Sequence, residues 1–248
     1  MKKDSILFQL NDLQRYYITR AEVVKAIDGI TLSISEGEFL AILGPSGSGK
    51  STLLNLLSGL DKPTGGSIFF RNFDYSKLTD SKLCDLRRYE IGIVFQFYNM
   101  HPSLSAIENI EYPMMIANIP AKKRHERSEK LIRQVGLYDK RDNSPAELSG
   151  GEKQRVGIAR ALTNDPKVII ADEPSGDLDS ENAVKILKLL ADIHQDQGKT
   201  IIMVTHDESL LTENMRVIYI EDGNVAIAQK GVHNEQKGFQ TSMTEEFS

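Results

Sequence analysis

The sequence predicts an α/β protein whose core is a mostly parallel β-sheet covered by helices. Three short apolar runs lead to this prediction, namely FLAIL (39–43), VIIA (168–171) and TIIMV (200–204). A glycine-rich loop and a helical pattern follow the first run, and another helical pattern separates the other two. Strands that alternate with helices in this way are typical of parallel sheets.

The helix predicted between the second and third runs has one apolar face. Ile186, Leu190 and Ile193 recur at i, i+4 and i+7, which places them on the same side of an α-helix. Ser180 precedes this pattern, and serine is one of the residue types preferred at a helix N-cap. We therefore expect a helix that is capped by Ser180 and packs against the sheet.

Other strands are predicted at the two ends of the chain. Near the N-terminus, short strands of a separate antiparallel layer are expected in SILFQL, VVKAI and TLSIS, with SIFF (67–70) joining them later. Near the C-terminus, VIYI (217–220) and VAIA (225–228) are expected to form a hairpin closed by Asp222-Gly223, a dipeptide that favours tight β-turns.

Residues 97–160 form a helical insertion in this prediction. Their helix-compatible stretches are 105–118, 121–136 and 150–163, and Pro120 and Pro145 separate them. We expect one domain over residues 1–228. The polar, glycine-dotted residues 229–248 are expected to form a poorly ordered tail.

Composition excludes several classes of protein. A net charge of -5 over 248 residues argues against a broad nucleic-acid surface. The basic stretch 121–133 contains pairs of opposite charge at i,i+4, which favours a solvated helix face. The apolar runs are far too short to cross a bilayer, and no apolar segment follows the N-terminal lysines to form a secretory signal. The single Cys84 has no partner for an internal disulfide, so we expect a cytoplasmic protein.

The strongest motif is a phosphate-binding loop between the first apolar run and a helix. GPSGSGKST matches G-x-x-x-x-G-K-[ST] and comprises Gly44, Pro45, Ser46, Gly47, Ser48, Gly49, Lys50, Ser51 and Thr52. The glycines let successive backbone amides face one concave point at the start of a helix, where the positive end of the helix dipole favours phosphate. Lys50 is expected to reach the terminal phosphates, and the Ser51 hydroxyl to bind Mg²⁺.

Two other predicted strands end in groups suited to phosphate chemistry. VIIADEP ends with Asp172 and Glu173, and TIIMVTHD ends with His206. Taken alone, such a carboxylate pair is more often the start of a solvated loop, and such a histidine is more often structural. Ligands of open α/β sheets bind at the carboxyl ends of the strands. Because the phosphate loop is expected at that same edge, it favours a functional role for these residues over a structural one. We expect Asp172 to hold Mg²⁺ through water and Glu173 to polarise the attacking water.

A second phosphate-binding turn is predicted in LSGGEKQR (148–155). Ser149, Gly150 and Gly151 open a helix about a hundred residues after the first loop. Since the first loop already cradles the phosphates of one nucleotide, this turn is expected to serve a nucleotide bound to another copy. The prediction is a head-to-tail pair with two composite sites.

The order of these motifs resembles that of the ATP-binding-cassette (ABC) ATPases over about residues 5–228. The resemblance implies a P-loop NTPase (RecA-like) core that takes ATP and Mg²⁺. It also implies that Gln96 is the Q-loop glutamine, which touches Mg²⁺ and takes part in catalysis, and that His206 is the switch histidine. SGDLD (175–179) resembles the D-loop. Tyr17 aligns with the aromatic residue that stacks on adenine, although Tyr16 is adjacent.

Within the family, the chain resembles the macrolide-efflux, lipoprotein-releasing and cell-division branch, as in LDKPTGG (60–66) and ADEPSGDLDS. The resemblance implies a homodimer that drives a membrane permease from the cytoplasmic face of the membrane. Phe97, Tyr98 and Met100 would line the dock for this permease, with simple core packing as the alternative. Two alternative functions are a small-solute importer ATPase and a soluble ABC ATPase that acts on nucleic acid or ribosomes.

Asp177 departs from the family pattern and generates a first prediction. A carboxylate stands here where the family commonly has alanine or asparagine, and it adds negative charge near the expected dimer interface. Asp177→Asn should therefore tighten the ATP-bound dimer. The dimer fraction on a sizing column in MgATP checks this, and equal fractions for the variant and the parent protein would contradict it.

Overall fold

A computed structural model describes residues 5–20 and 22–230. The tail predicted over 229–248 therefore lies outside the described residues, except for its first two positions, which belong to the last strand. The strands are β1 (Ile6–Ile18), β2 (Val23–Ser35), β3 (Phe39–Leu43), β4 (Gly65–Phe70), β5 (Phe73–Asp74), β6 (Ile91–Val94), β7 (Val168–Asp172), β8 (Thr200–Val204), β9 (Arg216–Glu221) and β10 (Asn224–Lys230).

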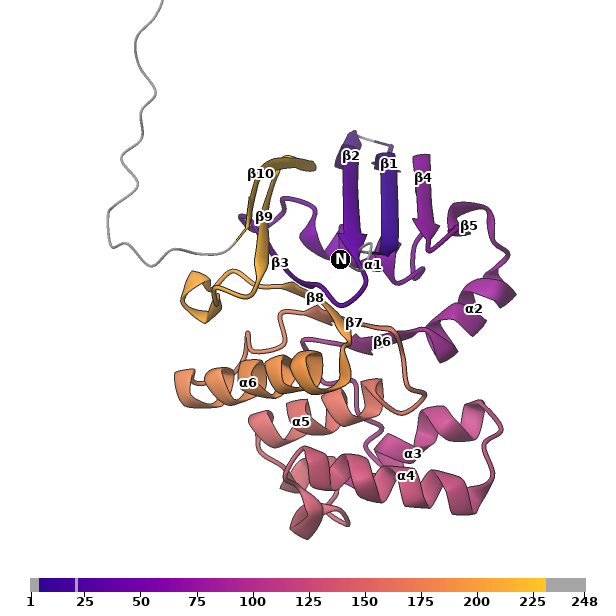
Figure 1. Cartoon of the computed structure of the whole chain (residues 1–248), viewed down its shortest axis with the longest axis vertical. Coiled ribbons are helices and arrows are strands. Elements are labelled where there is room, and N and C mark those ends of the chain that lie inside the picture. Colours follow the sequence, from indigo (N-terminus) through magenta and orange to yellow (C-terminus); the bar gives the residue numbers. More distant parts are fainter. Residues whose placement is uncertain (1–4, 21, 231–248) are drawn as a thin grey trace, which may run out of the picture.

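The helices occupy the segments between these strands (Figure 1). They are α1 (Lys50–Leu57), α2 (Asp80–Tyr89), α3 (Ala106–Ile116), α4 (Ala121–Gln134), α5 (Gly150–Ala161) and α6 (Ser180–Gln197). Short 3₁₀ turns lie at Tyr75–Lys77, Tyr138–Lys140, Pro145–Glu147 and Glu208–Leu210. None of the helices in the described ranges combines the length and the apolar character that a membrane span requires.

The central sheet has six strands in the order β10-β9-β3-β8-β7-β6. All neighbouring pairs are parallel except β9 and β10, which form the predicted hairpin. The three predicted core strands are confirmed as β3, β7 and β8. Strand β6 and the place of β9 in the core sheet beside β3 were not predicted from the sequence.

A second, antiparallel sheet has the order β2-β1-β4-β5 and confirms the separate layer expected at the N-terminus. Its strands are longer than predicted, because VVKAI and TLSIS belong to the single strand β2. Register shifts between β1 and β2 explain this difference. Such bulges let a strand continue through polar residues such as Asp12 and Asp28 without losing its pairing on either side.

The core lies on both faces of the parallel sheet. In β3, Leu40 and Ile42 pack toward α1 and the antiparallel sheet. Phe39, Ala41 and Leu43 point the other way and pack against the layer of α3 to α6. Burial on both faces is typical of a parallel sheet and accounts for the continuous apolar run of this strand.

The three helices predicted in the insertion are present as α3, α4 and α5, which lie together below the sheet in Figure 1. Ser105 and Glu108 form a capping box at the start of α3, and Ser149 and Glu152 form one at the start of α5. The prediction for α6 was wrong by one residue. Asp179, not Ser180, is its N-cap, because the Asp179 carboxylate accepts a hydrogen bond of 2.9 Å from the Asn182 amide.

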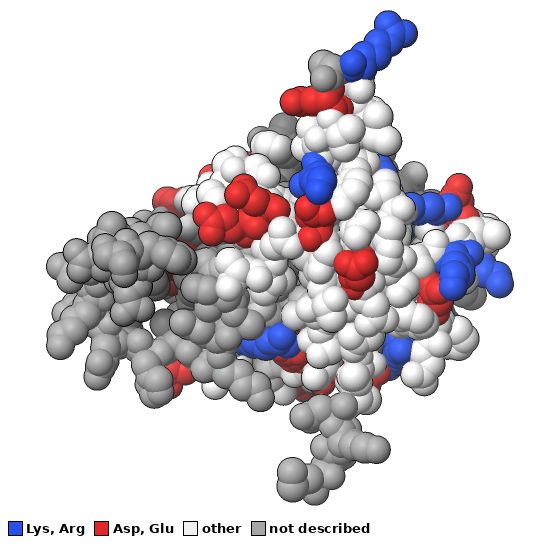
Figure 2. Space-filling view, turned by 90° about the horizontal axis from the view of Figure 1, so that it is seen from above, with Lys and Arg blue, Asp and Glu red and all other residues white. Residues whose placement is uncertain are grey.

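Charges of both signs are mixed on the face seen from above. Figure 2 shows lysine and arginine side chains scattered among aspartates and glutamates there, without a continuous basic area on that face. In the stretch 121–133, Arg133 pairs with Glu129 at 3.1 Å one turn away. That contact is of the kind predicted for a solvated helix face.

Candidate active site

The phosphate loop fills the turn between β3 and α1, where the backbone of two other strands lies very close. Gly44 has φ 147°, and a Cβ atom there would lie 2.1 Å from the carbonyl oxygen of Ile220. Gly49 has φ 106°, and a Cβ atom there would lie 2.2 Å from the carbonyl oxygen of Ala26. Both the left-handed backbone and the lack of space require glycine at these positions.

Lys50 begins helix α1 and is buried against the loop. Its Nζ atom donates hydrogen bonds of 2.8 Å to the Gly44 carbonyl and 2.7 Å to the Pro45 carbonyl. Within the described residues no carboxylate lies at ion-pair distance from this ammonium group, and the first turn of α1 has no acidic residue. The loop therefore presents an uncompensated positive charge at a helix N-terminus, an arrangement that binds anions.

Ser51 and Asp172 meet at the carboxyl edge of the sheet. The Ser51 hydroxyl donates a hydrogen bond of 3.2 Å to Oδ1 of Asp172, which ends β7. Burial raises the pKa of Asp172, and the nearby Glu173 charge raises it further, although the Ser51 hydrogen bond and Lys50 oppose this. A half-buried carboxylate beside a hydroxyl fits Mg²⁺, a cation that takes oxygen ligands and usually keeps several waters.

Glu173, His206 and Gln96 converge next to this pair. The Nδ1 atom of His206 lies 3.2 Å from Oε2 of Glu173. A Cβ atom at Gly176 would lie 3.1 Å from that same oxygen and 3.5 Å from Nε2 of Gln96. Glu173 itself has a left-handed φ of 42°, an uncommon conformation that is concentrated at functional sites. A polar cavity of about 320 Å³ opens beside Glu173 and His206.

The second predicted phosphate turn does not join this group. Ser149, Gly150 and Gly151 open α5, which lies below the sheet and apart from α1 in Figure 1. A Cβ atom at Gly150 would lie 2.9 Å from the Tyr98 hydroxyl, and one at Gly151 would lie 2.9 Å from Oδ1 of Asn182. In the residues that the structure describes, no hydrogen bond connects this turn with residues 44–52.

The two candidate adenine-stacking tyrosines differ in their surroundings. Tyr16 donates a hydrogen bond from its hydroxyl to Asp28. Tyr17 donates one of 2.9 Å to Asp61, and the Arg15 guanidinium lies 4.4 Å from the centre of its ring. The Tyr17 ring is 37% exposed and makes no hydrogen bond with the phosphate loop in the described part of the chain.

The residues predicted to line a dock have mixed environments. Phe97 is 72% exposed, as an interface residue would be. Met100 instead packs against the core cluster beneath α3 and α5. The Tyr98 hydroxyl is directed at Gly150, and burial raises its pKa, with the nearby Asp177 charge adding to the effect. Of the residues 97–100, some are therefore exposed at the surface and others are packed in the core.

Several residues that the sequence does not single out support the site from a distance. The Gly223 amide donates a hydrogen bond of 3.0 Å to the Ser48 carbonyl, and the Gly223 carbonyl accepts one of 2.9 Å from the Asp28 amide. Arg160 and Gln154 hold backbone carbonyls close to Gln96. No local sequence signal identifies these contacts, because the partners lie about 60 to 195 residues apart in the chain.

Comparisons with known proteins agree with this geometry. Residues 27–176 match the family model described as "ABC transporter". An uncharacterized ABC transporter ATP-binding protein of Thermotoga maritima is 43% identical over 94% of this chain and 98% of its own length. The macrolide export ATP-binding/permease protein MacB of Hyphomonas neptunium is 46% identical over 88% of this chain, but the match covers only 34% of MacB.

Two further comparisons extend this result. The lipoprotein-releasing system ATP-binding protein LolD of Legionella pneumophila is 38% identical over 90% of this chain and 98% of LolD. Among solved structures, the dimeric post-hydrolysis state of the cassette MJ0796 of Methanocaldococcus jannaschii, bound to ADP and Pi, has a TM-score of 0.84. It is 39% identical and covers 94% of this chain and 100% of that one.

Asp172 generates a prediction about stability and pH. Because its pKa is raised in the folded protein, the folded state binds more protons than the unfolded state at pH values between the two pKa values. The free energy of unfolding should therefore fall as pH rises through the window above the ordinary aspartate pKa of about 3.9. Asp172→Asn should remove this contribution and make the nucleotide-free protein more stable at neutral pH.

Urea unfolding of the nucleotide-free protein between pH 4 and pH 7 (roughly the span over which carboxylates titrate) measures this effect. The matched control is Asp192→Asn on the exposed side of α6, where Asp192 pairs with Lys188. An identical pH dependence for Asp172→Asn and the parent protein would contradict the prediction.

Proposed function

This chain belongs to the ABC transporter family, and we propose that two copies of it bind two MgATP between them, hydrolyse ATP and drive a membrane permease. As a member of this family the chain is an ATP-binding and ATP-hydrolysing protein. The similarity to MacB and LolD supports a permease of the efflux or lipoprotein-release type. The protein would then act at the cytoplasmic face of the membrane.

One observation carries the proposal. The two predicted phosphate-binding elements, residues 44–52 and 149–151, lie at the starts of α1 and α5, which are apart from each other in Figure 1. A head-to-tail pair would place the second element of each copy over the nucleotide held by the first element of the other. The likeness to a cassette that is dimeric with ADP and Pi bound supports this arrangement.

The chemistry assigned to each residue follows from its position. Lys50 would bind the β- and γ-phosphates in the place of the loop carbonyls that it now contacts. Ser51, Asp172 and Gln96 would hold Mg²⁺, which when bound neutralises charge on the phosphate oxygens. The backbone amides of residues 44–52 would cradle the phosphates, and Tyr17 would stack on adenine.

Glu173 is the proposed general base. Its carboxylate is held by His206 and lies next to Gln96, so it can accept a proton from water at the γ-phosphate once the pair has closed. His206 would fix the direction of the carboxylate and contact the phosphate. The partner's Ser149, Gly150 and Gly151 would donate hydrogen bonds to the same phosphate from the other side.

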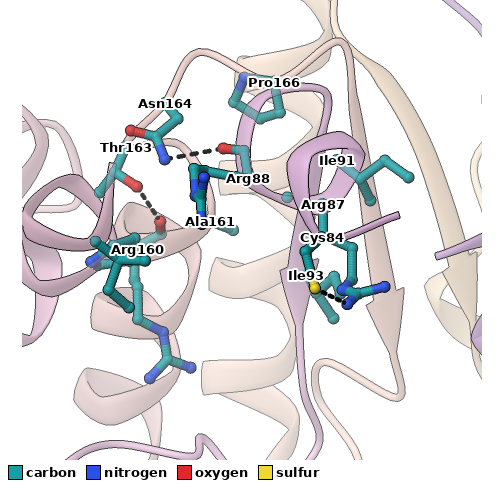
Figure 3. A pocket seen from close by; sticks show the side chains of 13 residues that line it. Cys84, Arg87, Arg88, Ile91, Ile93, Arg160, Ala161, Thr163, Asn164 and Pro166 are labelled. Atoms are coloured by element: carbon teal, nitrogen blue, oxygen red, sulfur yellow. Dashed lines mark hydrogen bonds between the residues drawn. The ribbon is translucent and has the colours of Figure 1, made fainter. Parts of the chain in front are cut away.

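A groove of about 350 Å³ is the proposed dock for the permease (Figure 3). It lies between α2, β6, α3 and the last turn of α5, and Ile93, Pro113 and Ile116 supply apolar lining. Arg160 lies across the groove from Arg87 in Figure 3. A helix of the permease with an apolar face and acidic flanks would fit this lining.

Glu173→Gln tests the hydrolytic part of the proposal. Glutamine keeps the size of the side chain but cannot take a proton, so hydrolysis should fall by about 100-fold or more while ATP binding persists. The ATP-bound dimer should then accumulate, as measured by light scattering in saturating MgATP. Glu181→Gln on exposed α6 is the matched control. Undiminished phosphate release would remove Glu173 as the base, and a strictly monomeric variant would exclude the composite sites.

Ile116→Glu tests the dock. Ile116 is 51% exposed at the groove, and a carboxylate there would disturb apolar packing with the permease. The ratio of permease-stimulated to basal ATPase rate should fall about tenfold or more, the effect of losing an interface residue that contributes strongly to binding. Ile18→Glu is the control, since Ile18 is 80% exposed at the far end of β1. Equal stimulation of both variants would contradict this assignment.

A further inference from the structure

The segment that follows β6 is held in a strained conformation. Tyr98 and Asn99 have consecutive left-handed φ values of 58° and 45°, which are uncommon for residues other than glycine. Phe97, directly before them, is 72% exposed. Strain of this kind persists only where surrounding contacts impose it, so other parts of the protein must hold this backbone.

Helix α5 supplies these contacts. The Arg160 guanidinium donates a hydrogen bond of 2.5 Å to the Asn99 carbonyl and one of 2.6 Å to the Tyr98 carbonyl. Gln154, which is 1% exposed, donates one of 3.4 Å to the Phe95 carbonyl. The helix thus binds the backbone on both sides of Gln96, and the planar fork of Arg160 suits two neighbouring carbonyls.

Arg160 has few alternatives to these carbonyl partners. It is half-buried, and in the part of the chain that the structure describes no carboxylate forms an ion pair with it. Burial lowers the pKa of its guanidinium without a compensating anion. Removing this charge in part from water costs free energy, which the charge-assisted hydrogen bonds to the two carbonyls offset. These bonds fix the position of residues 98 and 99.

The two ends of α5 connect different parts of the proposed site. Its first turn carries Gly150, which is packed against the side chain of Tyr98. Its last turn carries Arg160, which also lines the groove (Figure 3). Residues 95–99 are therefore attached to α5 at its first turn through the Tyr98 side chain, at Gln154, and at its last turn through Arg160.

We infer that Arg160 is a positioning residue that fastens residues 95–99 to helix α5, so that Gln96 and the Ser149–Gly151 turn move as one rigid body when a partner enters the groove. The inference rests on the proposed function for the identity of that partner. The fastening itself is a property of the isolated chain. A displacement at the groove would then shift the catalytic glutamine of one copy together with the turn that serves the other copy.

A fluorescent reporter tests the fastening directly. The chain contains no tryptophan, so Phe97→Trp introduces a single indole on the fastened segment. Arg160→Ala in this background should lower the fluorescence anisotropy and increase acrylamide quenching of the indole. Arg160→Lys keeps the charge but lacks the planar fork, so it should give intermediate values. Arg133→Ala on α4, which loses a surface contact with Glu129, is the matched control and should leave the indole unchanged.

Kinetics of otherwise unmodified chains supply the second readout. Arg160→Ala should lower kcat for ATP about tenfold or more, because it loses both charge-assisted hydrogen bonds. KM for ATP should stay the same because residues 44–52 are untouched. Arg160→Lys should recover part of kcat. A general loss of structure would instead change KM and kcat together.

Unchanged indole mobility and unchanged kcat in Arg160→Ala would overturn the inference. If Arg160→Ala does not fold, Arg160→Lys serves as the test variant. The same indole mobility and the same kcat as in the parent protein would then overturn the inference. The indole readout needs no permease or second copy. Absence of ATP hydrolysis or permease stimulation in the parent protein would count against the proposed function, while the mobility of residue 97 would still decide the role of Arg160.

Discussion

The proposed nucleotide site depends on the close packing of the predicted phosphate loop between strands from opposite ends of the chain. Gly49 lies against the Ala26 carbonyl of β2, and Gly44 lies against the Ile220 carbonyl of β9. The turn at Gly223 then bridges Ser48 and β2 through two backbone hydrogen bonds. These close approaches and hydrogen bonds restrict the shape of the loop. The antiparallel sheet, the C-terminal hairpin and the core sheet all contribute to that shape.

The parallel register of the core sheet brings the proposed catalytic groups next to this loop. Asp172 pairs with Val204, and Val204 pairs with Ile42, so β7, β8 and β3 end at the same level. The residues that follow these three strands are therefore neighbours in space. This geometry could be predicted from sequence, because the motifs stand directly after apolar runs and parallel strands place their carboxyl ends at one edge. The hydrogen bond between Ser51 and Asp172 is its direct result.

The elements that could not be predicted are those whose sequence lacks a periodic pattern. Helix α2 is mostly polar, and Leu83 is its one fully buried residue within the described chain. Strand β6 has four residues and contains Gly92, where a Cβ atom would lie 2.5 Å from the Ala161 carbonyl. At the start of α6, two adjacent residues are both suitable caps, and only the side-chain geometry of Asp179 decides between them. The contacts of Arg160 are equally hidden from sequence, since they reach backbone atoms about 60 residues away.

Under the proposed function, the contacts of Lys50 and Glu173 within one chain also explain why nucleotide would bring two copies together. Lys50 is satisfied by its own loop, and Glu173 is held by His206, so neither group requires a second copy before ATP binds. A ligand shifts an equilibrium only through contacts that differ between the two states. The triphosphate meets both the loop of one copy and the Ser149–Gly151 turn of the other only in the closed pair. ATP thus stabilises closure, and cleavage of the γ-phosphate removes the group that joins the copies, which makes the pair able to open again and to move a partner held in the groove.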